Sequence, residues 1–156
     1  MSYSQTKLVL NQLVADLSAL AVHVHQVHWY MRGPNFLKLH PLMDKYVDEL
    51  NDQLDVVSER LITLDGSPYA SLKEFADHTT MADEPGEWGV ATPERLRGLA
   101  TAYSRLADTY QRGIDVSGDE HDDVSQDIFI GFKGDIEKKI WMLKAELNEA
   151  PGIDPS

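Results

Sequence analysis

The sequence predicts an all-α fold, a bundle of four helices in which a long connection joins the second helix to the third. Four stretches of about 25–30 residues carry apolar side chains at intervals of three and four, as amphipathic helices do. No convincing run of alternating β-branched residues indicates a strand. The chain has 156 residues, 42% of them apolar, which is enough for a sizeable core. We expect one domain over residues 1–156, with short flexible ends at about 1–4 and 150–156.

The first two helices are expected over residues 4–31 and 35–64. The Arg-Gly-Pro tripeptide at 32–34 ends the first, because glycine permits a turn and proline disfavours helix in the residue before it. Gly66 and Pro68 end the second. The turn at 32–34 is short, so the first and second helices are expected to be antiparallel neighbours.

A long connection rich in Gly, Pro, Asp and Thr follows, with a short helical turn expected at 71–78. The third long helix opens at Thr92, where the threonine can cap and Pro93 and Glu94 suit the first turn. Its apolar pattern weakens between Gly113 and Gly118.

The fourth helix is expected from about residue 122 to 148. Four long helices with one long link in the middle are typical of a ferritin-like bundle, in which that link lets the third helix cross over. The short helical turn would lie within this crossover.

Metal-capable side chains occur at helical spacings in the second helix and just before it. Two pairs, each four residues apart, share a helix face, but the pairs are about three turns or 16 Å apart along the axis. Metal–ligand bonds are only about 2.0–2.6 Å long, so one helix cannot bring both pairs to one ion. The five residues are His28, His40, Asp44, Asp55 and Glu59.

A second copy of the chain resolves this problem of distance. If two such helices pack antiparallel about a two-fold axis near Glu49 and Leu50, the first pair of one chain faces the second pair of the other. A two-fold interface makes each contact twice, which gives two equivalent sites. Mixed imidazole and carboxylate ligands favour a first-row transition metal. The alternative interpretation is that these acids form an ordinary solvated surface.

Composition limits the classes of function. The chain has no cysteine, which excludes disulfides, thiolate metal sites and thiol catalysis. It carries a net charge of −12 and no basic arm at either end, so DNA binding is not expected. We see neither a signal peptide nor a stretch of apolar residues long enough for a membrane span, and expect a cytoplasmic protein.

Several motifs together resemble the Dps-like mini-ferritins, the iron-binding proteins of the starvation and peroxide-resistance type. The N-terminal half carries H-x-x-H-W-Y-M-R-G-x-x-F at 25–36, then His40 and Asp44, and D-x-x-x-E-R at 55–60. Two further segments extend the resemblance over nearly the whole chain. They are GSP-x-x-SLKEF at 66–75 and KGDIEKKIWMLKAEL near the C-terminus. The Glu-x-x-His motifs of ordinary ferritins are absent.

The resemblance implies a hollow homododecamer with ferroxidase centres at its two-fold interfaces. Iron(II) would be oxidised by hydrogen peroxide, or by O2, and a ferric mineral stored inside. His28, His40 and Asp44 would come from one subunit, with Asp55 and Glu59 from its mate. Iron is thus the expected metal. Trp29 would lie beside the site and accept oxidising equivalents; plain packing is the alternative for this residue.

The resemblance also implies acidic pores that admit iron. Asp123 and Asp127 match the pore positions best, and Asp119 is a substitute for a third acid that would fall at or beside Gly118. Acids at a helix start also favour the helix dipole, which is the alternative interpretation.

The remaining candidates carry less weight. His25 is a second-shell partner or an extra ligand, and Arg60 either orients an acid or makes a surface salt bridge. Three further histidines are expected at the surface or a pore rim: His23, His78 and His121.

Two other functions stay open beside iron storage. One is compaction of DNA, against which the acidic charge argues. The other is hydrolysis of an amide or ester by a metal-activated water at the same ligands, because ligand type does not dictate reaction class.

Overall fold

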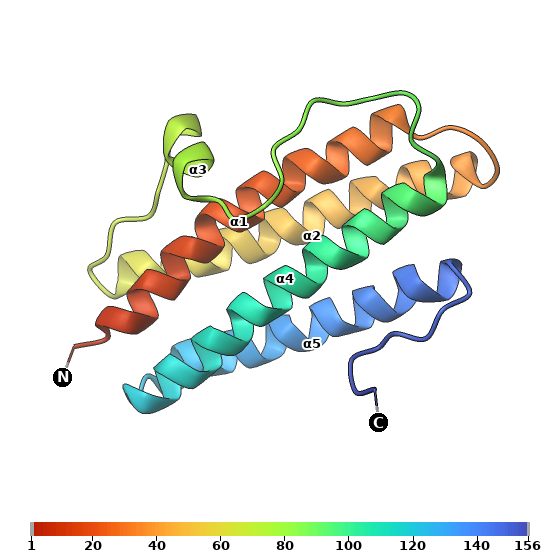
Figure 1. The fold of residues 1–156 in the computed structure, drawn as a ribbon. Coiled ribbons are helices and arrows are strands. Elements are labelled where there is room, and N and C mark those ends of the chain that lie inside the picture. Colours follow the sequence, from red (N-terminus) through yellow and green to blue (C-terminus); the bar gives the residue numbers. More distant parts are fainter. Residues whose placement is uncertain (1, 156) are drawn as a thin grey trace.

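Five α-helices make up the fold in the computed structural model, which describes residues 2–155. No strand occurs within this range. The ends expected to be flexible include Met1 and Ser156, which lie outside the described residues. The predicted all-α bundle, with a short helix in its crossover, is confirmed (Figure 1). The helices are α1 (Ser4–Tyr30), α2 (Phe36–Thr63), α3 (Leu72–His78), α4 (Thr92–Asp119) and α5 (Asp123–Glu146).

The long helices form two antiparallel pairs, α1 with α2 and α4 with α5. α1 also packs against α4, whereas α2 and α5 scarcely meet. The crossover carries the chain back along the bundle, so that α4 runs parallel to α2 (Figure 1). α2 therefore keeps a long exposed face, which carries three candidate acids: Asp44, Asp55 and Glu59.

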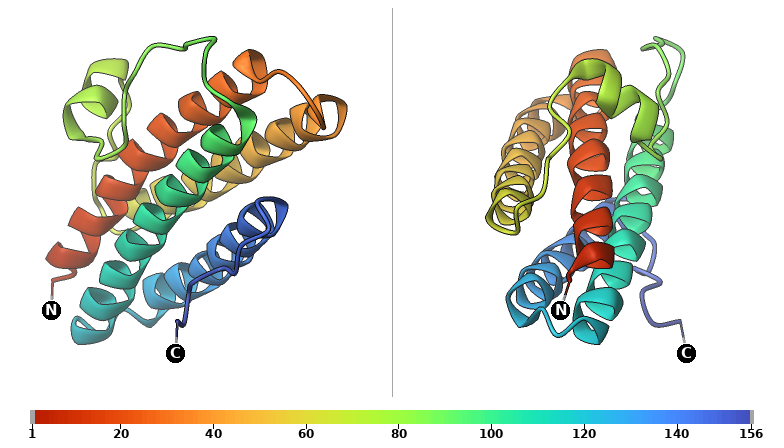
Figure 2. Two further views of the ribbon diagram at one scale, coloured as in Figure 1. Left: turned by 45° about the vertical axis from the view of Figure 1, so that its right-hand side comes forward. Right: turned by 90° about the vertical axis from the view of Figure 1, so that its left-hand side faces the viewer.

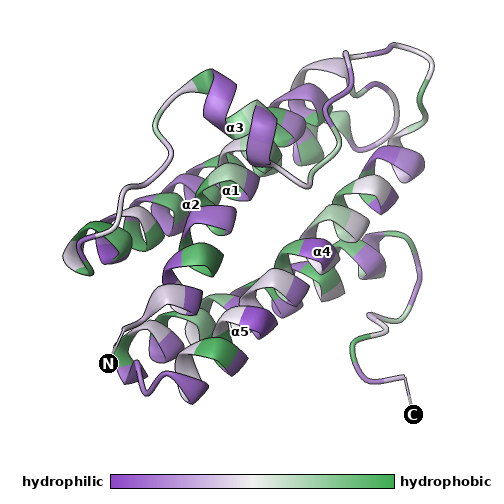
Figure 3. Cartoon of the chain, turned by 60° about the vertical axis from the view of Figure 1, so that its left-hand side comes forward, coloured by the Kyte–Doolittle hydropathy of each residue, from purple (hydrophilic) through white to green (hydrophobic). Residues whose placement is uncertain are grey.

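The core lies between the four long helices. Each of them presents both polar and apolar residues around its surface (Figure 3), and the apolar ones at intervals of three and four are buried. Tyr103, Tyr110 and Phe129 are among the largest fully buried side chains. The hydroxyl of Tyr110 donates to Gln53 over 2.8 Å, which satisfies two buried polar groups of α4 and α2.

α4 continues without a break through the glycines that were expected to weaken it. Gly113 is buried inside the helix, and a Cβ atom there would lie 2.7 Å from the ring of Phe129 in α5. The glycine therefore makes room for an aromatic ring of the neighbouring helix. Its effect on helix propensity, about 1 kcal/mol, is outweighed by the packing of α4 against α5.

A buried acid anchors the crossover on α1. Asp16 is fully buried and accepts hydrogen bonds from Thr79 Oγ1 over 2.9 Å and from the Thr80 backbone N–H over 2.7 Å. Gln12 donates to its other oxygen. These bonds fix the chain just after α3, which lies across α1 in Figure 2. A buried carboxylate held by several donors is stable without a cation.

One further expectation is corrected by the structure. Thr92 does not cap α4; its hydroxyl donates to the backbone carbonyl of Arg32, and Ala91 occupies the cap position.

Among the described residues, α1 is one helix long and apolar enough to cross a membrane, by length and composition alone. The core helix of a bundle meets the same criterion, and half of this apolar stretch is buried within the bundle.

Candidate metal centre

Two stacked imidazole rings join the end of α1 to the start of α2. The rings of His28 and His40 are parallel within 4°, with centroids 3.7 Å apart. Nδ1 of His28 lies 2.6 Å from the backbone carbonyl oxygen of His40, and Nδ1 of His40 lies 2.7 Å from that of His28. A carbonyl only accepts, so both Nδ1 atoms carry the proton. Each Nε2 is then left as the nitrogen that can bind a metal.

The local backbone explains why these bonds form. His28 lies in the last turn of α1, where carbonyl groups have no partner within the helix, so its carbonyl is open to the second imidazole. The link to α2 is short because Gly33 (φ +109°) and Asn35 (φ +69°) adopt left-handed conformations. This tight corner places the two histidines, twelve residues apart, ring on ring.

The first acid lies beside these rings. Oδ1 of Asp44 is 3.3 Å from Nε2 of His28. In the neutral tautomer with Nδ1–H, the lone pair of Nε2 faces this carboxylate, and a cation could bind both atoms. The two atoms are close enough together for one ion to bind both. His28 is 10% and Asp44 65% exposed, so the site opens to the surface.

The other two proposed ligands lie elsewhere on the chain's surface. Asp55 and Glu59 are exposed on the same face of α2, with Asp55 about 16 Å along the helix from Asp44. Within residues 2–155, no group of three or more histidines and acids is placed to hold a metal ion. Leu50, at the midpoint between the pairs, is buried in the chain's own core, so any two-fold contact would use the adjacent exposed face.

Aromatic side chains surround the histidines. Phe36 stacks on His40 with ring centroids 4.8 Å apart, which restricts the rotation of that imidazole. Trp29 is 62% exposed and stacks on His25 over 5.1 Å, so in this chain it packs on a histidine and not in the core. His25 stacks on Trp29, whereas the neighbouring histidine of α1, His28, stacks on His40.

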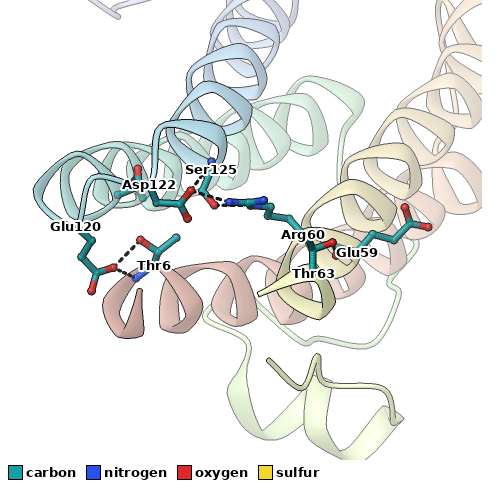
Figure 4. A network of polar contacts seen from close by, with 9 residues as sticks. Thr6, Glu59, Arg60, Thr63, Glu120, Asp122 and Ser125 are labelled. Atoms are coloured by element: carbon teal, nitrogen blue, oxygen red, sulfur yellow. Dashed lines mark hydrogen bonds and ion pairs between the residues drawn. The ribbon is translucent and has the colours of Figure 1, made fainter. Parts of the chain in front are cut away.

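Arg60 was expected either to orient an acid or to make a surface salt bridge; it pairs with an acid, but a buried one that is not among the proposed ligands. Its guanidinium reaches away from Glu59 to a buried carboxylate, Asp122, over 2.7 Å, and its Nε donates to Ser125 (Figure 4). Oδ1 of Asp122 also accepts from the Ser125 backbone N–H and so caps α5. Arg60 therefore joins the end of α2 to the start of α5, a contact between residues 62 apart that local pattern cannot indicate.

Comparison with known proteins decides the family. A model described as a ferritin-like domain matches residues 8–153. The DNA protection during starvation protein of Streptococcus suis is 48% identical over 97% of this chain and 88% of its own length. That of Listeria innocua is 42% identical over 94% of both chains. The crystal structure of Dps from Listeria monocytogenes superposes with a TM-score of 0.93 at 41% identity, covering 94% of this chain and 96% of that one.

The chain belongs to the Dps family of ferritin-like proteins. The structural neighbours include Dps from Listeria innocua in crystals soaked with cobalt or with zinc. They also include variants of that protein in which one or two histidines are replaced by glycine.

The acids assigned to the pore of a Dps shell lie at the corner between α4 and α5. Asp119 ends α4, Asp123 begins α5 and Asp127 follows one turn later, all of them exposed. His121, between the helices, is exposed and has a left-handed backbone (φ +60°). Its neighbour Asp122 is buried and structural.

Two other histidines have different environments. His78 is exposed, as expected, and stacks on Tyr69 over 4.2 Å. His23 is only partly exposed, and burial, with a smaller contribution from the positive charge of Arg95, lowers its pKa below the ordinary 6.5. It is therefore partly covered, beside Arg95 of α4, and is not a fully exposed residue.

Proposed function

We propose that this chain protects the bacterial cytoplasm by storing iron, which it oxidises at centres shared between two subunits. Membership of the Dps and ferritin-like family supports a role in iron storage and protection. The oxidant is hydrogen peroxide or O2, and five side chains bind the iron: His28, His40, Asp44, Asp55 and Glu59. The assembly is a hollow particle of twelve identical subunits.

The incomplete ligand set of the single chain carries this proposal. Asp44 lies beside His28 at the corner of α1 and α2, and His40 stacks on His28, with the Nδ1 atom of each imidazole at a backbone carbonyl. Asp55 and Glu59 are too far along α2 to join them. An antiparallel partner helix would supply the two missing acids, and a two-fold axis would build two such centres at once.

The chemistry follows from the ligand types. Carboxylate oxygens stabilise the higher charge of iron(III), and imidazole nitrogens add selectivity over calcium and magnesium. One peroxide molecule takes one electron from each of two iron(II) ions. Its O–O bond breaks, and two protons complete two water molecules, so that no hydroxyl radical is released. Trp29, exposed one residue from His28, would intercept oxidising equivalents that escape this reaction.

Iron(II) requires a route into the particle, and the ferric product requires a place to collect. Iron(III) hydrolyses and would nucleate on acids of the inner wall. The exposed Asp119, Asp123 and Asp127 would line the entry pores, where a negative field concentrates cations.

Co-assembly of two defective chains tests the shared site. Variant His40→Ala/Asp44→Ala loses the ligands of one half, and variant Asp55→Ala/Glu59→Ala those of the other. In a mixed pair, one centre lacks all four residues and the other is intact. Random mixing makes about half of the pairs mixed, so about a quarter of the wild-type centres are restored.

The measurement is the rate of ferric absorbance after iron(II) is added anaerobically, followed by peroxide. Each variant alone should be inactive, and the mixed particle should recover about a quarter of the wild-type rate. Recovery requires that ligands come from two chains. A mixed particle as inactive as its parents, at the same particle mass, would contradict a shared centre.

The relatives' name, DNA protection during starvation protein, makes DNA compaction a second candidate. The charge of −12 argues against it here, because contacts to phosphate need clustered Lys or Arg. Plasmid mobility should therefore be unchanged by the protein at low salt. Retardation that added salt abolishes would establish DNA binding.

A further inference from the structure

A buried arginine without a counter-ion marks a second cavity, separate from the metal centre. Arg95, in the first turns of α4, is 8% exposed and donates to the backbone carbonyl of Glu87. Its Nε–H has no hydrogen-bond partner, and within the described range 2–155 it takes part in no ion pair. Buried charges are normally paired, since their removal from water is costly. Arg95 is therefore held by one main-chain carbonyl, and its positive charge has no carboxylate partner among the described residues.

This guanidinium lines a cavity of about 290 Å³ between α1, the crossover and α4. Val27 and Val90 make part of its wall aliphatic. Three exposed carboxylates belong to the same lining, on the crossover and at the first turn of α4: Glu84, Glu87 and Glu94. A cation inside an acidic rim is a complementary surface for a molecule that carries both charges.

His23, on α1, lines the same cavity as Arg95. Its pKa is lowered first by burial and then by the charge of Arg95, so the imidazole is neutral near pH 7. A neutral imidazole can offer one N–H donor without adding a second positive charge. The carboxyl group of a ligand would thus meet two donors, of which one is charged.

We propose that this cavity binds a small zwitterion of the aliphatic α-amino acid class. The carboxylate accepts from the guanidinium of Arg95 where that group lines the cavity, the aliphatic side chain lies against Val27 and Val90, and the ammonium group faces the acidic rim. Multiply charged anions are disfavoured, because the three glutamates repel them. The metal centre takes no part in this binding.

Calorimetric titration of the assembled protein tests the proposal with three matched probes. L-valine carries both charges, 3-methylbutanoate only the carboxylate, and isobutylamine only the ammonium. We expect saturable binding of L-valine and binding at least about tenfold weaker for each half-molecule. Absence of saturable binding of L-valine, or equal affinity for 3-methylbutanoate, would overturn the proposal.

Variants locate the site. Arg95→Gln should weaken L-valine binding by about tenfold or more, whereas Arg105→Gln, an exposed arginine of the same helix, should leave it unchanged. Glu94→Gln, at the exposed rim, keeps the test valid if Arg95→Gln does not fold. It should weaken the binding of L-valine and not that of 3-methylbutanoate. Undiminished L-valine binding in Arg95→Gln, or in Glu94→Gln, would overturn the assignment.

Discussion

Nη2 of Arg60 lies 2.7 Å from Oδ1 of Asp122, and this contact helps to tie the C-terminal end of α2 to the cap of α5. The two side chains are 15% and 2% exposed, so the pair is shielded from solvent. α2 and α5 otherwise scarcely touch. The ion pair is therefore one of the few contacts between α2 and α5.

Asp122→Ala should destabilise the protein by about 3 kcal/mol, because it leaves the Arg60 charge buried without a partner and removes the cap of α5. The measurement is the shift in denaturant midpoint. Lys73→Ala serves as the control: its ion pair with Asp77 on α3 is 84% and 54% exposed and should contribute less than about 1 kcal/mol. Equal losses in the two variants would contradict the structural role of the buried pair.

Gly113→Ala should destabilise the protein by about 1–3 kcal/mol, because its Cβ would lie 2.7 Å from the Phe129 ring. Gly131→Ala, on α5, meets no atom of the chain within 4 Å and should be stabilising by up to about 1 kcal/mol, as alanine favours helix. Opposite signs for two identical substitutions distinguish packing from helix propensity. Stabilisation by both would show that the α4–α5 contact is looser than the structure indicates.

The contribution of Glu120 to stability should depend on pH. Burial opposes the charge of this carboxylate, but hydrogen bonds from the Thr6 hydroxyl and from the backbone N–H groups of Gln5 and Thr6 outweigh it and lower its pKa below 4.5. A depressed folded-state pKa stabilises the protein above the unfolded value, and this stabilisation is lost as the pH falls through the folded value.

Thermal unfolding of wild type and Glu120→Gln checks this expectation. The wild type should be the more stable protein at pH 7, and the difference should shrink once the pH falls below about 4.5. A difference that stays constant down to about pH 3 would show that the charge of Glu120 does not matter.

Metal binding should stabilise the paired state of the chain, since each subunit would present only part of the ligand set. Addition of cobalt(II), a spectroscopic substitute for iron(II), should raise the unfolding temperature of the wild type. Asp55→Ala/Glu59→Ala should lose this response, and Asp52→Ala, an exposed acid of α2 outside the proposed set, should keep it. The quantity compared is the change in unfolding temperature on addition of cobalt(II), so the stability of each variant without metal does not affect the result.

Local patterns predicted the helices well but not the contacts between distant residues. Glycine and proline signals located the end of α1 and the start of α2 within one residue, because these signals act on the backbone where they occur. Gly113 was misjudged for the opposite reason: its role depends on Phe129, in the next helix. The same holds for Arg60, whose partner lies 62 residues away.

At the candidate site, too, spacing along one helix was predictable and contacts across the corner were not. Spacing along one helix predicted that Asp44 and Asp55 cannot meet, and the structure places His28 and Asp44 together. The stacking of His28 on His40 was not predictable, because it depends on the left-handed backbone of Asn35 and on the angle of the corner. Whether a second chain supplies Asp55 and Glu59 stays a prediction.

The reciprocal bonds of His28 and His40 have a consequence for how metal affinity can be adjusted. Each imidazole is held by the other residue's main chain, so the distance between the two metal-facing nitrogens depends on the corner and not on side-chain rotamers alone. Residues 32–35, which touch no metal, would then act as a spacer. Lengthening or stiffening this link would alter iron selectivity while every ligand stays in the sequence.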